Sequence, residues 1–204
     1  MQVENHKEGV PFEYYVNLFK DLDPEEARVR TGADFDGSAF TVRLVNADYR
    51  ITWPEYSITA DREDAFALKS LPGQTFLLRW LLEGKSLPAR GEFKTVREMP
   101  WGELYIQPFT GRCLTRAAFT FGTRVAKFAA AMEKLGAQKL KYGDAGYELE
   151  LLPGYAMRLI VWEGDDEFPP NSQILYSDNF AEGFSAEDRV VAGDILITVA
   201  KTNM

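Results

Sequence analysis

A turn dipeptide separates two β-prone runs in YELELLPGYAMRLIVW, residues 147–162. Pro153-Gly154 favours a tight turn, because proline fixes φ near the value that the first central position needs and glycine accepts a positive φ at the next. In the second run, apolar residues occupy every second position from Met157 to Val161, which is typical of a largely buried strand. The stretch therefore predicts an antiparallel pair of strands.

Similar signals occur on either side of this pair. Residues 39–45 and 49–53 alternate apolar and polar side chains around Asn46-Ala47-Asp48, which predicts a β-hairpin or a pair of adjacent strands. Residues 74–83 carry apolar side chains on one helical face, and residues 125–135 repeat them with a period of 3.6 up to a glycine. Both segments are predicted to be amphipathic helices.

Capping residues, prolines and apolar spacing predict the remaining elements. Helices are expected at 11–22, from the N-cap Asp23 to about Arg30, at 112–121 and from Ser185 through Val199, strands at 92–96 and 173–176, and a connection at 101–108. Strand pairs mixed with helices, without a regular βαβ rhythm, indicate an α+β fold with an antiparallel or mixed sheet packed with several helices. Because no linker or repeat interrupts the chain, we expect a single domain over 1–204 with a flexible N-terminus at about 1–10.

The composition excludes several classes of protein. The chain has 204 residues, of which 46% are hydrophobic, so it can bury a full core. A single His and a single Cys cannot build a His-rich or Cys-rich metal site, an iron–sulfur cluster or a disulfide framework within one chain. A net charge of -8 disfavours nucleic acid and anionic membranes as partners. Without a predicted signal peptide or membrane span, the expected location is the cytoplasm.

The charges are segregated along the sequence. Residues 163–188 hold eight acids and no base, which equals the net charge of the whole chain. Residues 112–141 hold seven bases and one acid. The acidic and the basic segment are therefore the two places where charge indicates function.

Within the acidic segment, Glu163, Asp165, Asp166 and Glu167 follow the predicted strand that ends at Trp162. Four carboxylates within five positions could hold a hard cation such as Ca²⁺ or Mg²⁺, although the spacing matches no EF-hand. The alternative is that these acids are solvated loop charges, as exposed acids usually are.

In the basic segment, Arg112 and Arg116 lie four residues apart on a predicted helix, where they could cradle a phosphate or a carboxylate. The alternative is the wet side of an amphipathic helix. Cys113 lies beside these cations, which could lower its pKa, but a helical Cys next to Leu114 is more often a small core residue. His6, in the N-terminal segment, gives little support for nucleophilic catalysis.

The sequence resembles an uncharacterised prokaryotic family, domain of unknown function 3786, over nearly its whole length. The resemblance rests on the following residues: Ile51 to Pro54, Leu77 to Leu82, Phe109 to Arg112, Gly143 to Ala145, Trp162 to Pro170, Ile174 to Tyr176, and Glu187-Asp188. The stretch from Trp162 to Pro170 is the most specific of them. The resemblance implies an anaerobic host but no established activity, catalytic residue or cofactor.

Three functions remain open at the level of sequence. The first is a small-molecule-binding or accessory module, with its ligand in an aromatic cleft bordered by the loop of Trp162, Glu163, Asp165 and Asp166 and by the side chains of Arg112 or Arg116. The second is a metal-dependent enzyme that holds a divalent ion on the acidic segment and uses Asp144 as a base. The third is a structural homodimer subunit, which sedimentation would test.

Overall fold

The computed structural model describes the backbone of residues 6–204 and the side chains of residues 11–204. It divides into two compact units, Met1–Ser86 and Leu87–Met204, each of which has its own antiparallel sheet. The α+β class and the antiparallel pairing expected from the sequence are confirmed. The single-domain organisation stays a prediction.

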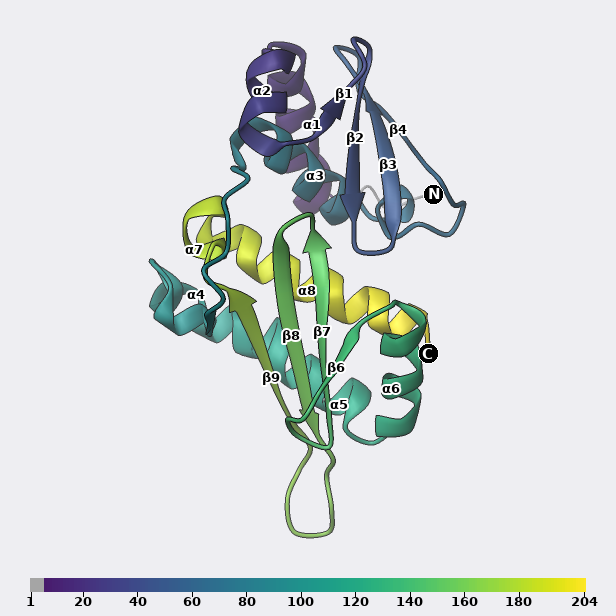
Figure 1. Ribbon diagram of the computed structural model, residues 1–204, viewed down its shortest axis with the longest axis vertical. Helices are drawn as coiled ribbons and strands as arrows, with labels where there is room; N and C mark the ends of the chain where they lie inside the picture. Colours follow the sequence, from purple (N-terminus) through teal and green to yellow (C-terminus); the bar gives the residue numbers. More distant parts are fainter. Residues whose placement is uncertain (1–5) are drawn as a thin grey trace. The chain divides into compact units, whose positions relative to one another are not determined.

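The first unit combines three α-helices with a four-stranded sheet of order β1-β2-β3-β4 (Figure 1). Its elements are α1 (His6–Lys20), α2 (Pro24–Thr31), β1 (Asp34–Phe35), β2 (Ala39–Leu44), β3 (Ala47–Thr52), β4 (Ser57–Ala60), the 3-10 helix η1 (Phe66–Lys69) and α3 (Leu71–Glu83). Phe19 of α1 packs against Phe40 of β2, with the ring centroids 6.1 Å apart. Leu77 and Leu81 of α3 are fully buried in this core.

Local signals place these elements well. Asp23 caps α2 by accepting hydrogen bonds from the backbone N–H groups of Glu25 and Glu26, at 2.9 and 3.1 Å, as predicted. The hairpin of β2 and β3 is also confirmed, although its turn is Val45-Asn46 rather than residues 46–48. A two-residue turn matches the right-handed twist of the strands, and here it holds Val45 at φ 55°.

The start of the chain differs from the expectation. The first helix begins at His6 rather than at residue 11, so residues 6–10 are helical. The rest of the expected flexible N-terminus, residues 1–5, lies outside the described residues. The side chain of His6 also lies outside the described part of the structure.

The second unit is a five-stranded sheet of order β5-β9-β8-β7-β6 with helices packed against one face (Figure 1). Its elements are β5 (Phe93–Lys94), the 3-10 helix η2 (Val96–Glu98), α4 (Gly102–Phe109), the π-helix η3 (Thr110–Thr115), α5 (Arg116–Phe121), α6 (Val125–Lys134), β6 (Gln138–Leu140), β7 (Ala145–Leu152), β8 (Tyr155–Trp162), β9 (Asn171–Ser177), α7 (Phe180–Gly183) and α8 (Ala186–Thr202).

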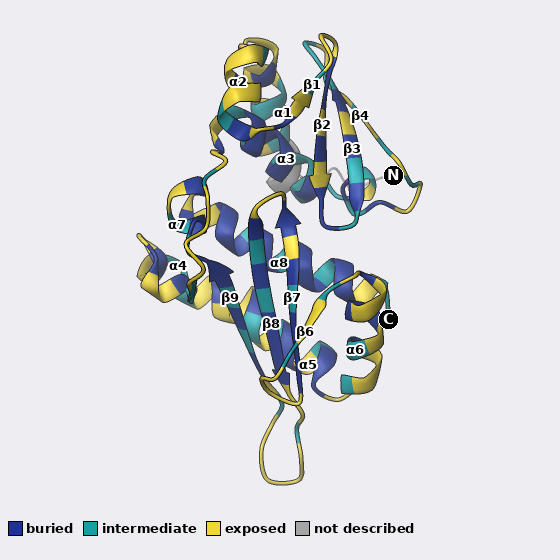
Figure 2. Cartoon of the chain, in the orientation of Figure 1, coloured by how far each residue is buried: buried dark blue, intermediate teal, exposed yellow. Residues whose placement is uncertain are grey.

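The predicted pair of strands, β7 and β8, lies inside this sheet and is confirmed. Met157, Leu159 and Val161 of β8 are fully buried, while Arg158 between them is half-buried and forms an ion pair with Glu148 on β7 at 2.8 Å. Figure 2 shows the resulting change of burial along the strand. Because the apolar residues face the helices, this strand forms much of the core of the second unit.

The expected connection at 101–108 is wrong, since these residues form most of α4. The side chain of its N-cap residue, Trp101, makes no capping hydrogen bond, and the backbone of Trp101 has φ 63°. A backbone turn starts it instead, in which the N–H of Gly102 donates to the carbonyl oxygen of Met99 at 3.0 Å. The helix therefore lacks the start signal on which the sequence prediction relied.

Two matched substitutions test the single-domain prediction. We expect Leu77→Ala in the first unit and Leu159→Ala in the second to lower the free energy of unfolding by about 3 kcal/mol each, because both side chains are fully buried. If the chain is one domain, each substitution shifts the same single transition in calorimetry. Two transitions, of which each variant moves only one, would contradict a single domain.

Candidate functional site

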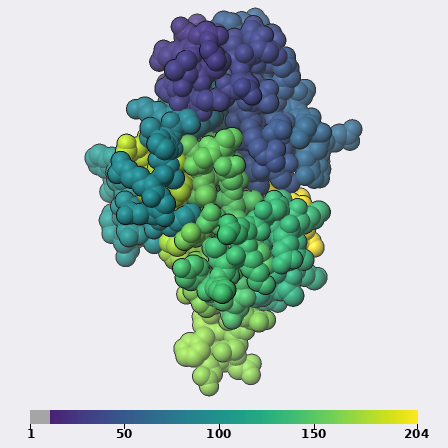
Figure 3. Space-filling model, viewed as in Figure 1, coloured from purple at the N-terminus to yellow at the C-terminus, as the bar shows by residue number. Residues whose placement is uncertain are grey.

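The acidic residues 163–167 lie in the loop between β8 and β9. This loop projects from the end of the sheet, as the ribbon diagram and the space-filling view both show (Figures 1 and 3). Asp165 accepts hydrogen bonds from the N–H groups of Glu167 and Phe168, at 2.8 and 2.7 Å. These bonds lower the pKa of Asp165, because they favour the charged carboxylate. Its carboxylate thus stabilises a turn within the loop.

The other residues predicted for this loop site are mostly turned to solvent. Trp162 and the side chains of Glu163, Asp166 and Glu167 are exposed. Among the side chains of residues 11–204, no three from His, Cys, Asp and Glu are grouped in a way that could hold a metal ion. The metal site expected at Glu163, Asp165, Asp166 and Glu167 stays a prediction, and calorimetry with Mn²⁺, Mg²⁺ and Ca²⁺ would test it.

Arg112 and Arg116 share one side of the π-helix and the start of α5, and both contact Asp194 of α8. Arg112 Nη2 lies 3.2 Å from Asp194 Oδ2, while Arg116 forms an ion pair with Asp194 and donates to Thr198 Oγ1 at 2.8 Å. The two arginines thus connect two helices of the second unit. Asp144, the residue expected as a base, accepts a hydrogen bond from the N–H of Glu163 at 2.7 Å and so holds the start of the acidic loop.

Cys113 is fully buried, and its thiol donates to the carbonyl oxygen of Val190 at 3.4 Å. Burial raises the pKa of this thiol to about 12, and the charge of Asp194 acts in the same direction. The nearby arginines oppose this shift but do not outweigh it. The structure therefore favours a core residue over a reactive thiolate.

The buried thiol gives a prediction about pH and reactivity. We expect Cys113 of the folded protein to resist a thiol reagent at pH 8 and to react at the rate of unfolding. Because the folded pKa lies above the unfolded one, the thiol contributes stability that is complete below about pH 8.5 and is lost as the pH rises toward 12. A C113A/K127C variant, with its thiol on an exposed position of α6, serves as the reactive control. Equal labelling rates in the two folded proteins would contradict the prediction.

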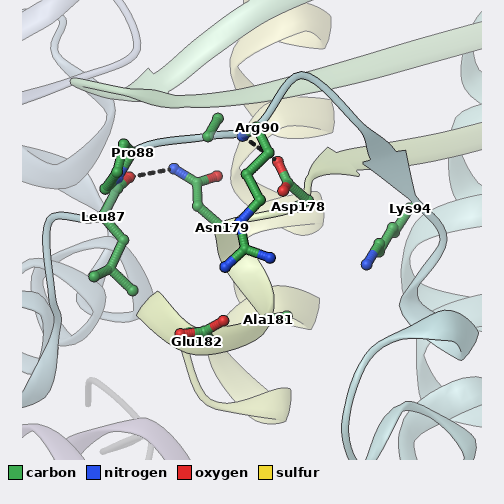
Figure 4. A pocket seen from close by; sticks show the side chains of 9 residues that line it. Leu87, Pro88, Arg90, Lys94, Asp178, Asn179, Ala181 and Glu182 are labelled. Atoms are coloured by element: carbon green, nitrogen blue, oxygen red, sulfur yellow. Dashed lines mark hydrogen bonds between the residues drawn. The ribbon is translucent and has the colours of Figure 1, made fainter.

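A pocket of about 210 Å³ lies in the second unit, between the segment that leads into β5 and the end of β9 with α7 (Figure 4). The residues that line it are Leu87, Pro88, Ala89, Arg90, Lys94, Asp178, Asn179, Ala181 and Glu182. Asp178 and Glu182 belong to the acidic segment 163–188, but none of the nine was a candidate site residue from the sequence. The two segments are about ninety positions apart, so spacing within either of them gives no sign of the pocket.

A network of buried hydrogen bonds fixes one wall of the pocket. The amide nitrogen of Asn179 donates to the carbonyl oxygens of Leu87 and Gly154, at 2.7 and 2.9 Å, and the hydroxyl of Ser177 donates to Asn179 Oδ1 at 2.6 Å. The N–H of Leu87 donates to the hydroxyl of Tyr155 at 3.3 Å. Ser177 and Asn179 are at most 5% exposed, so these bonds are shielded from water and hold the wall in place.

The charged side chains of the pocket have few partners. Asp178 accepts a hydrogen bond from the backbone N–H of Arg90 at 2.9 Å, and Lys94 Nζ lies 3.8 Å from Glu92. The guanidinium of Arg90 and the carboxylate of Glu182 make no hydrogen bond or ion pair with the described residues. Figure 4 shows the Arg90 side chain extending from its loop toward α7, which carries Glu182. Charges of both signs are thus available to a ligand.

The fold and the pocket define an α+β protein of two compact units, with a small charged pocket in the second. The chain belongs to the family described as "Domain of unknown function (DUF3786)", whose family model matches residues 23–199 and so includes parts of both units. The resemblance expected from the sequence is confirmed.

Searches of curated proteins and of solved structures found no match. Within the described residues, no helix has the length and apolar character needed to span a membrane.

Proposed function

We propose that this protein is a small-molecule-binding module whose ligand occupies the pocket of the second unit. The proposal rests on one observation: the pocket has a wall that buried hydrogen bonds hold in place, and it also has charged side chains without partners among the described residues. Asn179 and its partners form the buried wall, while Arg90 and Glu182 face the same pocket without partners among the described residues. A site that is rigid before binding loses little conformational entropy when the ligand enters.

The proposal keeps the function expected from the sequence but places the site elsewhere. Arg112 and Arg116 already contact Asp194, and Asp165 already accepts two backbone hydrogen bonds. A ligand at those positions would have to displace existing bonds. The pocket offers charged groups that need no such exchange, which favours it as the binding site.

The chemistry of the lining favours binding over catalysis. The nine lining residues include no His, Cys, Ser, Thr or Tyr, which are the usual nucleophiles and proton carriers besides carboxylates and lysines. The volume of about 210 Å³ lies below the range of drug-sized sites and suits a small metabolite. Recognition of a small charged molecule is the task that these residues fit best.

A thermal-shift screen of small charged metabolites against the full chain tests the proposal. We expect at least one compound to raise the melting temperature in a saturable way, and Arg90→Ala to weaken its binding at least tenfold. Lys127→Ala removes the same charge from an exposed position of α6 in the same unit and serves as the control. A broad screen without a hit, or a hit that both variants retain equally, would contradict a binding function in this pocket.

A further inference from the structure

The charges around the pocket balance. Two cations, Arg90 and Lys94, and two anions, Asp178 and Glu182, line a volume of about 210 Å³. Asp178 already accepts a hydrogen bond from the backbone N–H of Arg90, at 2.9 Å. Lys94 Nζ already lies 3.8 Å from a carboxylate oxygen of Glu92. The two groups without a partner among the described residues, Arg90 and Glu182, have opposite signs.

A ligand with a single charge would satisfy only one of these two groups. A carboxylate bound to Arg90 would leave the anion of Glu182 without a partner, and an amine bound to Glu182 would leave the cation of Arg90 without one. Arg90 and Glu182 are both exposed, so the group left unpaired keeps part of its water and the cost is modest. A ligand that carries both signs pairs each group and avoids this cost.

We propose that the pocket binds a small zwitterion, a molecule with one carboxylate and one ammonium group such as a free amino acid. This inference rests on the binding function proposed above and adds the class of ligand. The carboxylate pairs with the guanidinium of Arg90, whose planar donors match both carboxylate oxygens, and Lys94 adds a second positive charge. The ammonium group pairs with Glu182.

The remaining lining limits the rest of the ligand. Both N–H donors of Asn179 are already used, because its nitrogen donates to two carbonyl oxygens, and its oxygen already accepts from Ser177. Leu87, Pro88 and Ala89 line the same pocket with apolar atoms. The part of the ligand between or beside its two charges is therefore short and aliphatic.

Calorimetry with matched ligands tests the class. The probes are L-alanine, L-valine and 4-aminobutyrate, and each is compared with the amine and the acid that lack one of its two charges: ethylamine and propionate, isobutylamine and isovalerate, propylamine and butyrate. We expect at least one zwitterion to bind the full chain at least tenfold more tightly than either of its analogues.

Two variants assign the charges. Arg90→Ala should abolish the preference for the zwitterion over the amine, and Glu182→Gln should abolish its preference over the acid. Lys127→Ala and Glu103→Gln remove the same charges from exposed positions of the same unit and should leave both preferences unchanged.

The outcomes separate this inference from the proposed function. If an acid or an amine binds as tightly as its zwitterion and Arg90→Ala or Glu182→Gln weakens it, the zwitterion is wrong and the binding function holds. If the zwitterions fail to bind but another metabolite binds in a way that depends on Arg90, the zwitterion is again wrong and the binding function again holds. If neither the zwitterions nor the broad screen gives a ligand that depends on Arg90, both proposals fail.

Discussion

Arg189→Ala is expected to lower the free energy of unfolding by about 4 kcal/mol in urea denaturation. Arg189 is 2% exposed, and its guanidinium donates to the carbonyl oxygens of Phe184 and Pro100, at 3.3 and 2.9 Å. Alanine would leave both acceptors without this donor and open a cavity where the long side chain packs. Burial lowers the pKa of Arg189, because its side chain is shielded from water.

Arg97→Ala is the matched control for this substitution. Arg97 belongs to the same unit, but its side chain is 62% exposed, and among the described residues its one ion pair is with Glu103, at 3.1 Å. Exposed ion pairs contribute roughly 0 to 1 kcal/mol, so the control should change stability little. If Arg189→Ala costs no more than Arg97→Ala, the buried guanidinium does not hold α8 to the segment at Pro100.

Gly102→Ala is the second substitution with a large expected effect, again about 4 kcal/mol of unfolding free energy. A Cβ at this position would overlap the carbonyl oxygen of Val96, far inside van der Waals contact. That oxygen accepts a hydrogen bond from the N–H of Met99 at 3.2 Å, so it cannot move away without breaking the turn that starts α4. A clash with backbone exceeds the usual 1 to 3 kcal/mol of an overpacked core, because no side chain can change rotamer to relieve it.

Gly111→Ala provides the comparison within the same helical stretch. Apart from the neighbouring residues of its own helix, nothing lies within 4 Å of the Cβ that alanine would add there, and Gly111 is exposed. Alanine also favours helix, so this variant should be neutral or slightly stabilised. Urea denaturation of both variants decides the matter. Similar stabilities for Gly102→Ala and Gly111→Ala would mean that the segment at Val96 yields more easily than its hydrogen bonds indicate.

Arg189→Ala and Gly102→Ala both affect the start of α4, which is the part of the fold that the sequence predicted least well. Short-range signals were sufficient for α2, which has a side-chain cap, and for the β7–β8 pair, which has a turn dipeptide. The start of α4 has neither, because a backbone turn at Met99 and the distant side chain of Arg189 define it. A contact across about ninety positions leaves no periodicity in either segment.

The candidate site was difficult to predict for the same reason. The sequence pointed to Asp165 and Arg116 because charges cluster around them, but both are engaged with other groups of the protein. The pocket depends on Asn179, a single amide that joins the strand end to the segment at Leu87. An isolated Asn after a strand carries no local signal, so only the folded structure reveals its role.

The loop between β8 and β9 is a suitable position for attaching this protein to a surface. Trp162 and Asn171 pair across the two strands, so the sheet fixes both ends of the loop. Phe168 near its tip is 67% exposed, and the space-filling view shows the loop standing out from the body of the second unit (Figure 3). A short peptide epitope inserted between Asp166 and Glu167 should therefore immobilise the protein on a sensor surface while leaving the paired strands intact.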